Sequence, residues 1–280
     1  MIEVIKSIIF GVLEGITEWL PISSTGHLIL LEEFIQLDAS ADFMKMFNVV
    51  IQLGAIMAVV VLFFKKLNPF DREKSEKQKL ATWHLWFTVV IAVIPSAVIG
   101  LLLDDWFDEH FFNPPTVAAM LIIYGIAFIL VERWREGKKP EIRSPYAVDM
   151  KTAALIGCFQ VLAIIPGTSR SGSTILGATL LGMSRTAAAE FSFFMAIPTM
   201  LGASGLKAVK YILTSETAMT GTEAMILIVG CLVAFAVSLV AIKFLMDFVK
   251  RHTFKSFGVY RIALGAVVCL YFIIKIALKA

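Results

Sequence analysis

Six stretches of this chain are apolar enough and long enough to cross a lipid bilayer, and they constrain the fold more than any other feature. They cover residues 46–64, 84–103, 115–132, 187–207, 223–246 and 257–277. Each is close to the roughly 20 residues that a helix rising about 1.5 Å per residue needs to cross about 30 Å of hydrocarbon. The composition agrees, because 58% of the residues are hydrophobic and only 17% are charged. We predict an all-α integral membrane protein that forms one polytopic domain over residues 1–280.

Two further apolar segments, at about residues 2–31 and 152–183, are interrupted by polar motifs. The first motif reads "EGITEWLPISSTGH" at residues 14–27, and the second reads "PGTSRSGST" at residues 166–174. Each contains a proline, Pro21 or Pro166, which lacks a backbone donor and disfavours helix in the residue before it. We therefore predict that each segment consists of two half-helices with a break at the proline.

Basic residues are concentrated in three of the connections between the apolar stretches. Residues 65–79, 133–151 and 243–255 carry six, six and four Lys or Arg residues, whereas residues 104–115 carry none. The positive-inside rule places the three basic connections in the cytoplasm, and the connections at 104–115 and after residue 210 outside. The first broken segment then dips into the membrane from outside and the second dips in from the cytoplasm.

These orientations predict six transmembrane helices and two re-entrant hairpins arranged as inverted-topology repeats, at about residues 1–135 and 150–280. A weak internal match aligns Gly11 with Gly157 and, after a one-residue adjustment, Pro21 with Pro166. In membrane proteins built from inverted repeats, the ligand site usually lies where the broken helices meet. We expect the site at the two hairpin tips.

The two motifs carry a resemblance to a known family. An ExxxE pair followed by PxSSTGH occupies residues 14–27, and an intact PGxSRSxxT occupies residues 166–174. Over essentially its whole length, the chain resembles the undecaprenyl-pyrophosphate phosphatases of the bacitracin-resistance type. The resemblance implies a multi-pass enzyme of the bacterial cell membrane that hydrolyses a polyprenyl diphosphate to the monophosphate, recycles the lipid carrier of wall synthesis and gives bacitracin resistance. It also implies an active site that opens to the extracytoplasmic side.

The paired acids of the first motif favour a metal site. Glu14 and Glu18 are four residues apart, so they share a helix face, and an acidic residue at membrane depth costs about 2.5–3.5 kcal/mol. A divalent cation, Mg²⁺ or Ca²⁺, held by both carboxylates and by phosphate oxygens would offset this cost. The alternatives are a pair at a wet helix end or a pair neutralised by Arg170.

The hydroxyls and the histidine of the first motif are candidates for the chemistry itself. Ser24 and His27 are three residues apart at the expected start of a half-helix, as a nucleophile and its proton carrier would be. Serine is equally a common helix cap, so the resemblance, more than the spacing, favours Ser24 as the nucleophile. His27 could alternatively serve an attacking water or bind phosphate. Ser23 and Thr25 are predicted to bind substrate.

The second motif has the composition of a phosphate cradle. Its glycines permit positive φ angles, its hydroxyls donate hydrogen bonds, and the following half-helix presents its positive N-terminus. Arg170 adds a planar cationic fork and is predicted to be catalytic. The predicted substrate-binding residues are Gly167, Thr168, Ser169, Ser171, Ser173, Thr174 and, in the span after the first hairpin, Gln52. The alternatives are a glycine turn with hydroxyl caps and, for Gln52, an interhelical hydrogen bond.

Two other classes of function fit the same architecture, namely a secondary transporter and a lipid flippase. Both need reversible binding, whereas hydrolysis needs an aligned attacking group, so the clustering around Ser24 and Arg170 favours the phosphatase. No GxxxxGK[ST] loop supports nucleotide binding, and no nucleic-acid partner is expected. The partners predicted are a polyprenyl diphosphate and the bilayer. The sequence leaves open prenyl chain length, metal identity, phosphoserine against direct water attack, lipid flipping and the oligomeric state, a homo-oligomer included.

Overall fold

The computed structural model describes residues 1–215 and 218–278, apart from the side chains of residues 104, 105 and 108. Its α-helices are α1 (Ile2–Thr17), α2 (Ser24–Phe34), α3 (Ala41–Leu62), α4 (Phe64–Leu67), α5 (Glu76–Phe111), α6 (Pro114–Arg135), α7 (Met150–Val161), α8 (Arg170–Leu180), α9 (Arg185–Thr214), α10 (Gly221–Arg251) and α11 (Lys255–Ala277). Two 3₁₀ turns, η1 (Pro145–Ala147) and η2 (Leu162–Ile164), precede and follow α7. The described residues form no β-strand, only one isolated bridge between Ile142 and Met183.

The six predicted spans are confirmed as the six long helices α3, α5, α6, α9, α10 and α11, each of which is apolar and long enough to cross a bilayer. Large apolar side chains cover their outer faces, among them Leu101, Leu232 and Val240, which are 71%, 62% and 69% exposed. A water-soluble protein rarely exposes so much contiguous apolar surface. The chain is a multi-pass membrane protein.

Side chains at the helix starts explain several of the observed boundaries. Asn113 accepts a hydrogen bond from the backbone N–H of Thr116 and precedes two prolines at the first positions of α6. Thr220 and Glu223 form a reciprocal capping box at the start of α10. Asp149 accepts a hydrogen bond from the N–H of Thr152 and so caps the start of α7.

The membrane-crossing part of α5 ends at Leu103, as predicted, but the helix itself continues to Phe111. No glycine or proline lies between residues 101 and 113, so nothing in the sequence ends the helix before Asn113 and Pro114. Only residues 112–113 separate α5 from α6.

Both predicted helix breaks are confirmed. Helix α1 ends at Thr17 and α2 begins at Ser24, so Pro21 lies in the gap between them. Helix α7 and its 3₁₀ turn end at Ile164 and α8 begins at Arg170, with Pro166 in that gap. These four helices have 16, 11, 12 and 11 residues, fewer than a helix needs to cross the hydrocarbon alone.

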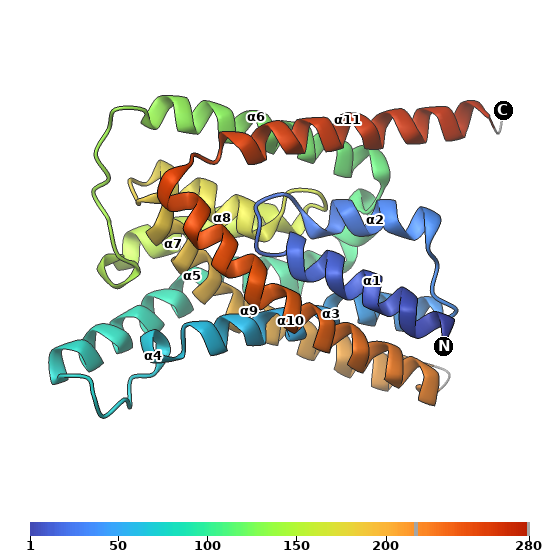
Figure 1. Ribbon diagram of the computed structural model, residues 1–280, viewed down its shortest axis with the longest axis horizontal. Coiled ribbons are helices and arrows are strands. Elements are labelled where there is room, and N and C mark those ends of the chain that lie inside the picture. The colour runs from blue at the N-terminus through green and yellow to red at the C-terminus, as the bar shows by residue number, and fades with distance from the viewer. Residues whose placement is uncertain (216–217, 279–280) are drawn as a thin grey trace.

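The first helix of each broken pair packs along a long helix from the other half of the chain. Helix α1 packs along α10, and α7 packs along α5. Both contacts are made through a glycine: a Cβ at Gly11 would lie 2.7 Å from the carbonyl oxygen of Gly230, and a Cβ at Gly157 would lie 2.2 Å from that of Ala92. Helices α6 and α11 run side by side along one edge of the molecule (Figure 1).

Gly157→Ala tests the close approach of α7 to α5. The added methyl group would overlap backbone that cannot rotate away, so we expect the variant to lose about 1–3 kcal/mol of stability, measured as a lower unfolding temperature in detergent. Gly100→Ala on α5 is the matched control, because a Cβ there meets nothing within 4 Å and removing a helix glycine stabilises by about 0.5–1 kcal/mol. Equal unfolding temperatures for the two variants would contradict the packing described.

Candidate functional site

The two helix breaks meet at a cavity of about 180 Å³ inside the helical bundle. Residues from α3 and α9 complete its wall. The lining residues are Glu18, Ser24, Thr25, Gln52, Ala163, Ile165, Pro166, Gly167, Ser169, Arg170, Thr199, Met200 and Ala203. Polar groups from the two motifs therefore lie on one internal surface, although nearly 150 residues separate them in the sequence.

The two breaks share one backbone geometry. Ser23 has φ 74° and ψ 99°, and Ser169 has φ 73° and ψ 121°. They are the only described residues other than glycine with positive φ. Each is a helix N-cap whose hydroxyl accepts a hydrogen bond from the N–H of a glycine three residues on, Gly26 at 3.2 Å or Gly172 at 3.1 Å. Ser24 and Arg170 are thus the first residues of α2 and α8. The turns are locally strained in the same way, a feature that often marks functional sites.

Glu18 lies where the two motifs touch. One carboxylate oxygen accepts a hydrogen bond of 2.9 Å from the Ser24 hydroxyl, and the other accepts one of 2.9 Å from the Arg170 guanidinium. The side chain of Glu18 is 7% exposed and that of Arg170 is 13% exposed. Because the pair is largely buried, each charge depends on the other for stabilisation. The hydroxyl of Ser24 is left for this contact because Ser23, and not Ser24, caps α2.

Further contacts hold Arg170 in place. Its guanidinium also donates to the backbone carbonyl of Ser192 at 2.8 Å and lies 5.9 Å from the ring of Trp19. The Nε atom of Arg170 is buried without a hydrogen-bond partner. Ser171, the next residue, donates to the backbone carbonyl of Glu18 at 3.0 Å. The start of α8 is therefore attached to the end of α1 by both side-chain and backbone contacts.

Seven of the predicted site residues line the cavity and seven do not. Those that line it are Glu18, Ser24, Thr25, Gln52, Gly167, Ser169 and Arg170. Ser23 caps α2, while Ser173 and Thr174 bond to other helices: Ser173 donates to the carbonyl of Phe159, and the hydroxyls of Thr174 and Ser192 lie 2.7 Å apart. Several hydroxyls of the second motif thus hold α8 in position behind the cavity wall.

Glu14, the first acid of the ExxxE pair, is completely buried. Neither of its carboxylate oxygens has a hydrogen-bond partner. A buried carboxylate without partners is strongly unfavourable unless it binds a proton or a cation. Among the described residues, no cluster of three or more His, Cys, Asp or Glu side chains is found, so a cation here would take its other ligands from substrate or water.

His27 is directed to a different set of groups from those predicted. Its Nδ1 atom lies 2.7 Å from the carbonyl oxygen of Ser23, and its Nε2 atom lies 2.7 Å from the hydroxyl of Tyr260 on α11. A carbonyl only accepts, so Nδ1 carries the proton and Nε2 accepts from Tyr260 when the ring is neutral. The rings of His27 and Tyr260 stack at a centroid distance of 5.7 Å. His27 does not line the cavity.

The sequence analysis did not identify two polar residues near the site, Thr199 and Arg261. Thr199 lines the cavity and accepts a hydrogen bond of 3.2 Å from Gln160 on α7. Arg261 on α11 is fully buried and contacts backbone carbonyls of both breaks. Arg261 could have been found by the reasoning applied to Arg170, because it is a charged residue within an apolar span.

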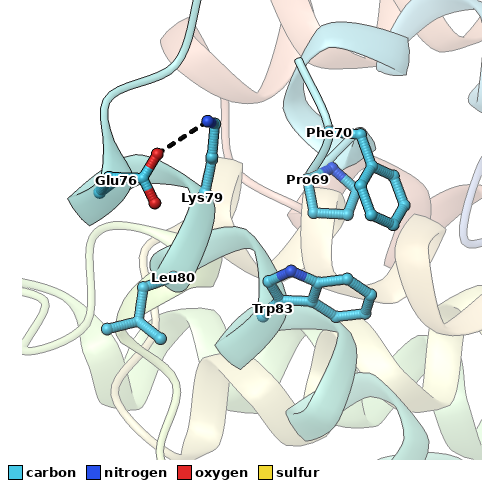
Figure 2. Close-up of a pocket in the computed structure, with 6 residues that line it drawn as sticks. All are labelled: Pro69, Phe70, Glu76, Lys79, Leu80 and Trp83. Atoms are coloured by element: carbon cyan, nitrogen blue, oxygen red, sulfur yellow. Dashed lines mark hydrogen bonds and ion pairs between the residues drawn. The ribbon is translucent and has the colours of Figure 1, made fainter. Parts of the chain in front are cut away.

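A second groove lies on the surface, between the start of α5 and the loop that follows α4 (Figure 2). It is lined by Pro69, Phe70, Glu76, Lys79, Leu80 and Trp83. Glu76 and Lys79 form an ion pair of 2.8 Å within it, and its lining includes no residue of either motif. The cavity between the breaks is therefore the candidate site.

The chain is similar to known proteins over nearly its whole length. The profile of a family described as bacitracin resistance protein BacA matches residues 7–267, which include both motifs. The undecaprenyl-diphosphatase of Streptococcus mutans serotype c is 58% identical over 275 residues, covering 98% of each chain. The proteins of the same name from Streptococcus equi subsp. equi and Streptococcus suis are 56% and 54% identical, covering 98% and 97% of each chain.

Proposed function

The chain belongs to the BacA family of bacitracin resistance proteins, and from this premise we propose that it hydrolyses undecaprenyl diphosphate to undecaprenyl phosphate and inorganic phosphate. The reaction would recycle the lipid carrier of bacterial wall synthesis. The observation that carries the proposal is the Ser24, Glu18 and Arg170 contact at the cavity wall, which combines a hydroxyl, a base and a cation. A transporter or flippase has no need of a serine held against a carboxylate.

Ser24 is the proposed nucleophile and Glu18 the proposed base. As the Ser24 oxygen forms a bond to the terminal phosphorus, its proton passes to the carboxylate oxygen 2.9 Å away, and the bridging P–O bond breaks to release the polyprenyl phosphate. Water then attacks the phosphoserine, inorganic phosphate leaves, and Ser24 regains a proton from Glu18. The hydrogen bond between a nucleophile and its base is the feature expected of such a pair.

Positive charge around the cavity supports phosphoryl transfer, which depends mainly on positioning and electrostatic stabilisation. Helices α2 and α8 both begin at the cavity, so their free first-turn N–H groups and dipoles favour an anion there. Arg170 adds a permanent charge, and its fork can bind phosphate oxygens as well as Glu18. The contacts of His27 with Ser23 and Tyr260 favour Glu18 over His27 as the base.

A divalent cation, Mg²⁺ or Ca²⁺, is the proposed cofactor. The unpartnered carboxylate of Glu14 fits this group, because cation binding would satisfy two buried oxygens that nothing else satisfies. Glu14 and Glu18 would hold the ion, which when bound would neutralise charge on the diphosphate.

Two inverted-topology repeats that share one site are the proposed architecture. The chain crosses the membrane three times between the two broken segments, so these segments face opposite sides. The matched turns at Ser23 and Ser169 and the matched glycine contacts at Gly11 and Gly157 support the relationship. Each hairpin is proposed to be re-entrant, as in other membrane proteins of this design.

The cavity is proposed to open to the extracytoplasmic side of the bacterial cell membrane. Ion pairs tie together the helix ends that the basic loops assign to the cytoplasm. Lys66 contacts Glu190 at 2.7 Å, and Arg185 contacts Glu132 at 2.6 Å. The backbone N–H of Phe254 also donates to Glu132, at 2.9 Å. These contacts support a cavity that is closed at its cytoplasmic end and open to the substrate at the other.

The variants Ser24→Ala and Ser23→Ala distinguish the role of a nucleophile from that of a helix cap. Because Ser24 is proposed to attack phosphorus, we expect Ser24→Ala to lower phosphate release in detergent by roughly three orders of magnitude or more, with an unfolding temperature close to that of the wild type. Ser23→Ala removes only the cap and should cost about 1 kcal/mol of stability while retaining measurable turnover. Near-normal turnover in folded Ser24→Ala would assign the attack to water.

Removal of divalent cations tests the role of the ExxxE pair. We expect a chelator to stop phosphate release from purified wild-type protein and added Mg²⁺ or Ca²⁺ to restore it. Glu14→Gln preserves volume but removes one anionic ligand, so the Mg²⁺ concentration for half-maximal activity should rise at least about tenfold, equivalent to about 1.4 kcal/mol. Full activity in the chelator would refute the metal proposal, and a folded wild-type protein that releases no phosphate from the substrate would refute the phosphatase itself.

A further inference from the structure

Arg261 is a buried cation for which the mechanism above gives no role. It lies on α11 within a predicted span and is 0% exposed. A charged residue within an apolar span is rare and usually has a partner or a function. The two other arginines near the bundle interior have carboxylate partners: Arg170 contacts Glu18, and Arg185 contacts Glu132.

Backbone carbonyls are the hydrogen-bond partners of Arg261. Its guanidinium donates to the carbonyl of Pro21 at 3.2 Å, in the first break. It also donates to the carbonyls of Gly167 at 2.8 Å and Thr168 at 2.9 Å, in the second break. Within the described part of the chain, no ion pair joins Arg261 to an acid. One side chain thus holds both breaks at the residues just before Ser23 and Ser169.

These contacts fix the direction in which the second turn presents its donors. A trans peptide is planar, so its carbonyl and the following N–H point in opposite directions. The carbonyl of Thr168 points to Arg261, and the N–H of Ser169 therefore points the other way. Ser169 lines the cavity, whereas the N–H of Thr168 is already bonded to the carbonyl of Ile165 at 3.2 Å. The N–H of Ser169 is therefore the donor that this turn offers to an anion, beside the free first-turn N–H groups of α8.

Space for the guanidinium depends on a glycine. A Cβ at Gly172 would lie 3.2 Å from Nη1 of Arg261 and 3.1 Å from Cβ of Ser169. The guanidinium also lies over the ring of Tyr124, with its centre 5.5 Å away. The cation is therefore enclosed by α6, α8 and the two turns.

We propose that Arg261 is a positioning residue for phosphoryl transfer, which clamps the Pro21 and Gly167–Thr168 turns so that Ser24 and the N–H of Ser169 face the same phosphate. The proposal rests on the phosphatase function proposed above. Arg261 affects the reaction by holding the backbone of both turns, and it does not contact the substrate. Its uncompensated charge also raises the positive potential at the site.

Steady-state kinetics of Arg261→Lys test the proposal. An ammonium keeps the charge but lacks the planar fork that reaches both turns, so we expect kcat to fall at least about 100-fold while KM changes less than about threefold. Arg185→Lys is the matched control: it keeps the charge but loses the two-point contact with Glu132, neither residue lines the cavity, and kcat per folded molecule should be unchanged. Wild-type kcat in folded Arg261→Lys would overturn the proposal.

A second variant covers the case in which Arg261→Lys does not fold. Gly172→Ala keeps the arginine and its charge but pushes the guanidinium by a few tenths of an ångström, and we expect kcat to fall about tenfold with little change in KM. Unchanged kcat in folded Gly172→Ala would then overturn the proposal. Phosphate release by the wild type is measured first, so that failure of the phosphatase function is distinguished from failure of the role given to Arg261.

Discussion

Burial of charge at membrane depth is the constraint on which the rest of this structure depends. Glu18 and Arg170 are both largely buried, and each would be strongly destabilising without the other. Their contact joins a helix end from the first half of the chain to a helix start from the second, so it can form only when the two halves have assembled. The same ion pair brings Ser24 against a carboxylate. Stability and proposed chemistry therefore depend on one contact.

The helices around this contact are organised to expose polar backbone only inside the protein. Two breaks in helices leave free N–H groups and carbonyls that hydrocarbon cannot satisfy. Arg261 satisfies carbonyls of both breaks, and the Ser23 and Ser169 hydroxyls satisfy N–H groups at the starts of α2 and α8. The buried side-chain atoms without a hydrogen-bond partner include Nε of Arg170 and both carboxylate oxygens of Glu14, where an anionic substrate and a cation are proposed to bind.

Much of this fold could be predicted from the sequence, because the strongest sequence signals extend over whole helices. Apolar runs of about 20 residues and prolines within polar motifs give the six spans and the two breaks. The extension of α5 beyond its span was not predicted, although charged residues do not stop a helix. The meeting of the two motifs could be expected from topology, but the direction of each side chain could not. His27 turns to Tyr260, a residue 233 positions away, and Arg261 was passed over although it is a charged residue within an apolar span.

Turnover is proposed to depend on the guanidinium fork of Arg170, which Glu18 and the phosphate share. Turnover of purified Arg170→Lys on undecaprenyl diphosphate, at saturating Mg²⁺ and with folding checked by thermal unfolding, tests it most directly. Lysine keeps the positive charge near Glu18 but cannot contact two acceptors in a planar fork. We predict at least about a 100-fold loss of kcat with the unfolding temperature preserved. Near-wild-type turnover in that variant would contradict the account and reduce Arg170 to a structural ion-pair partner.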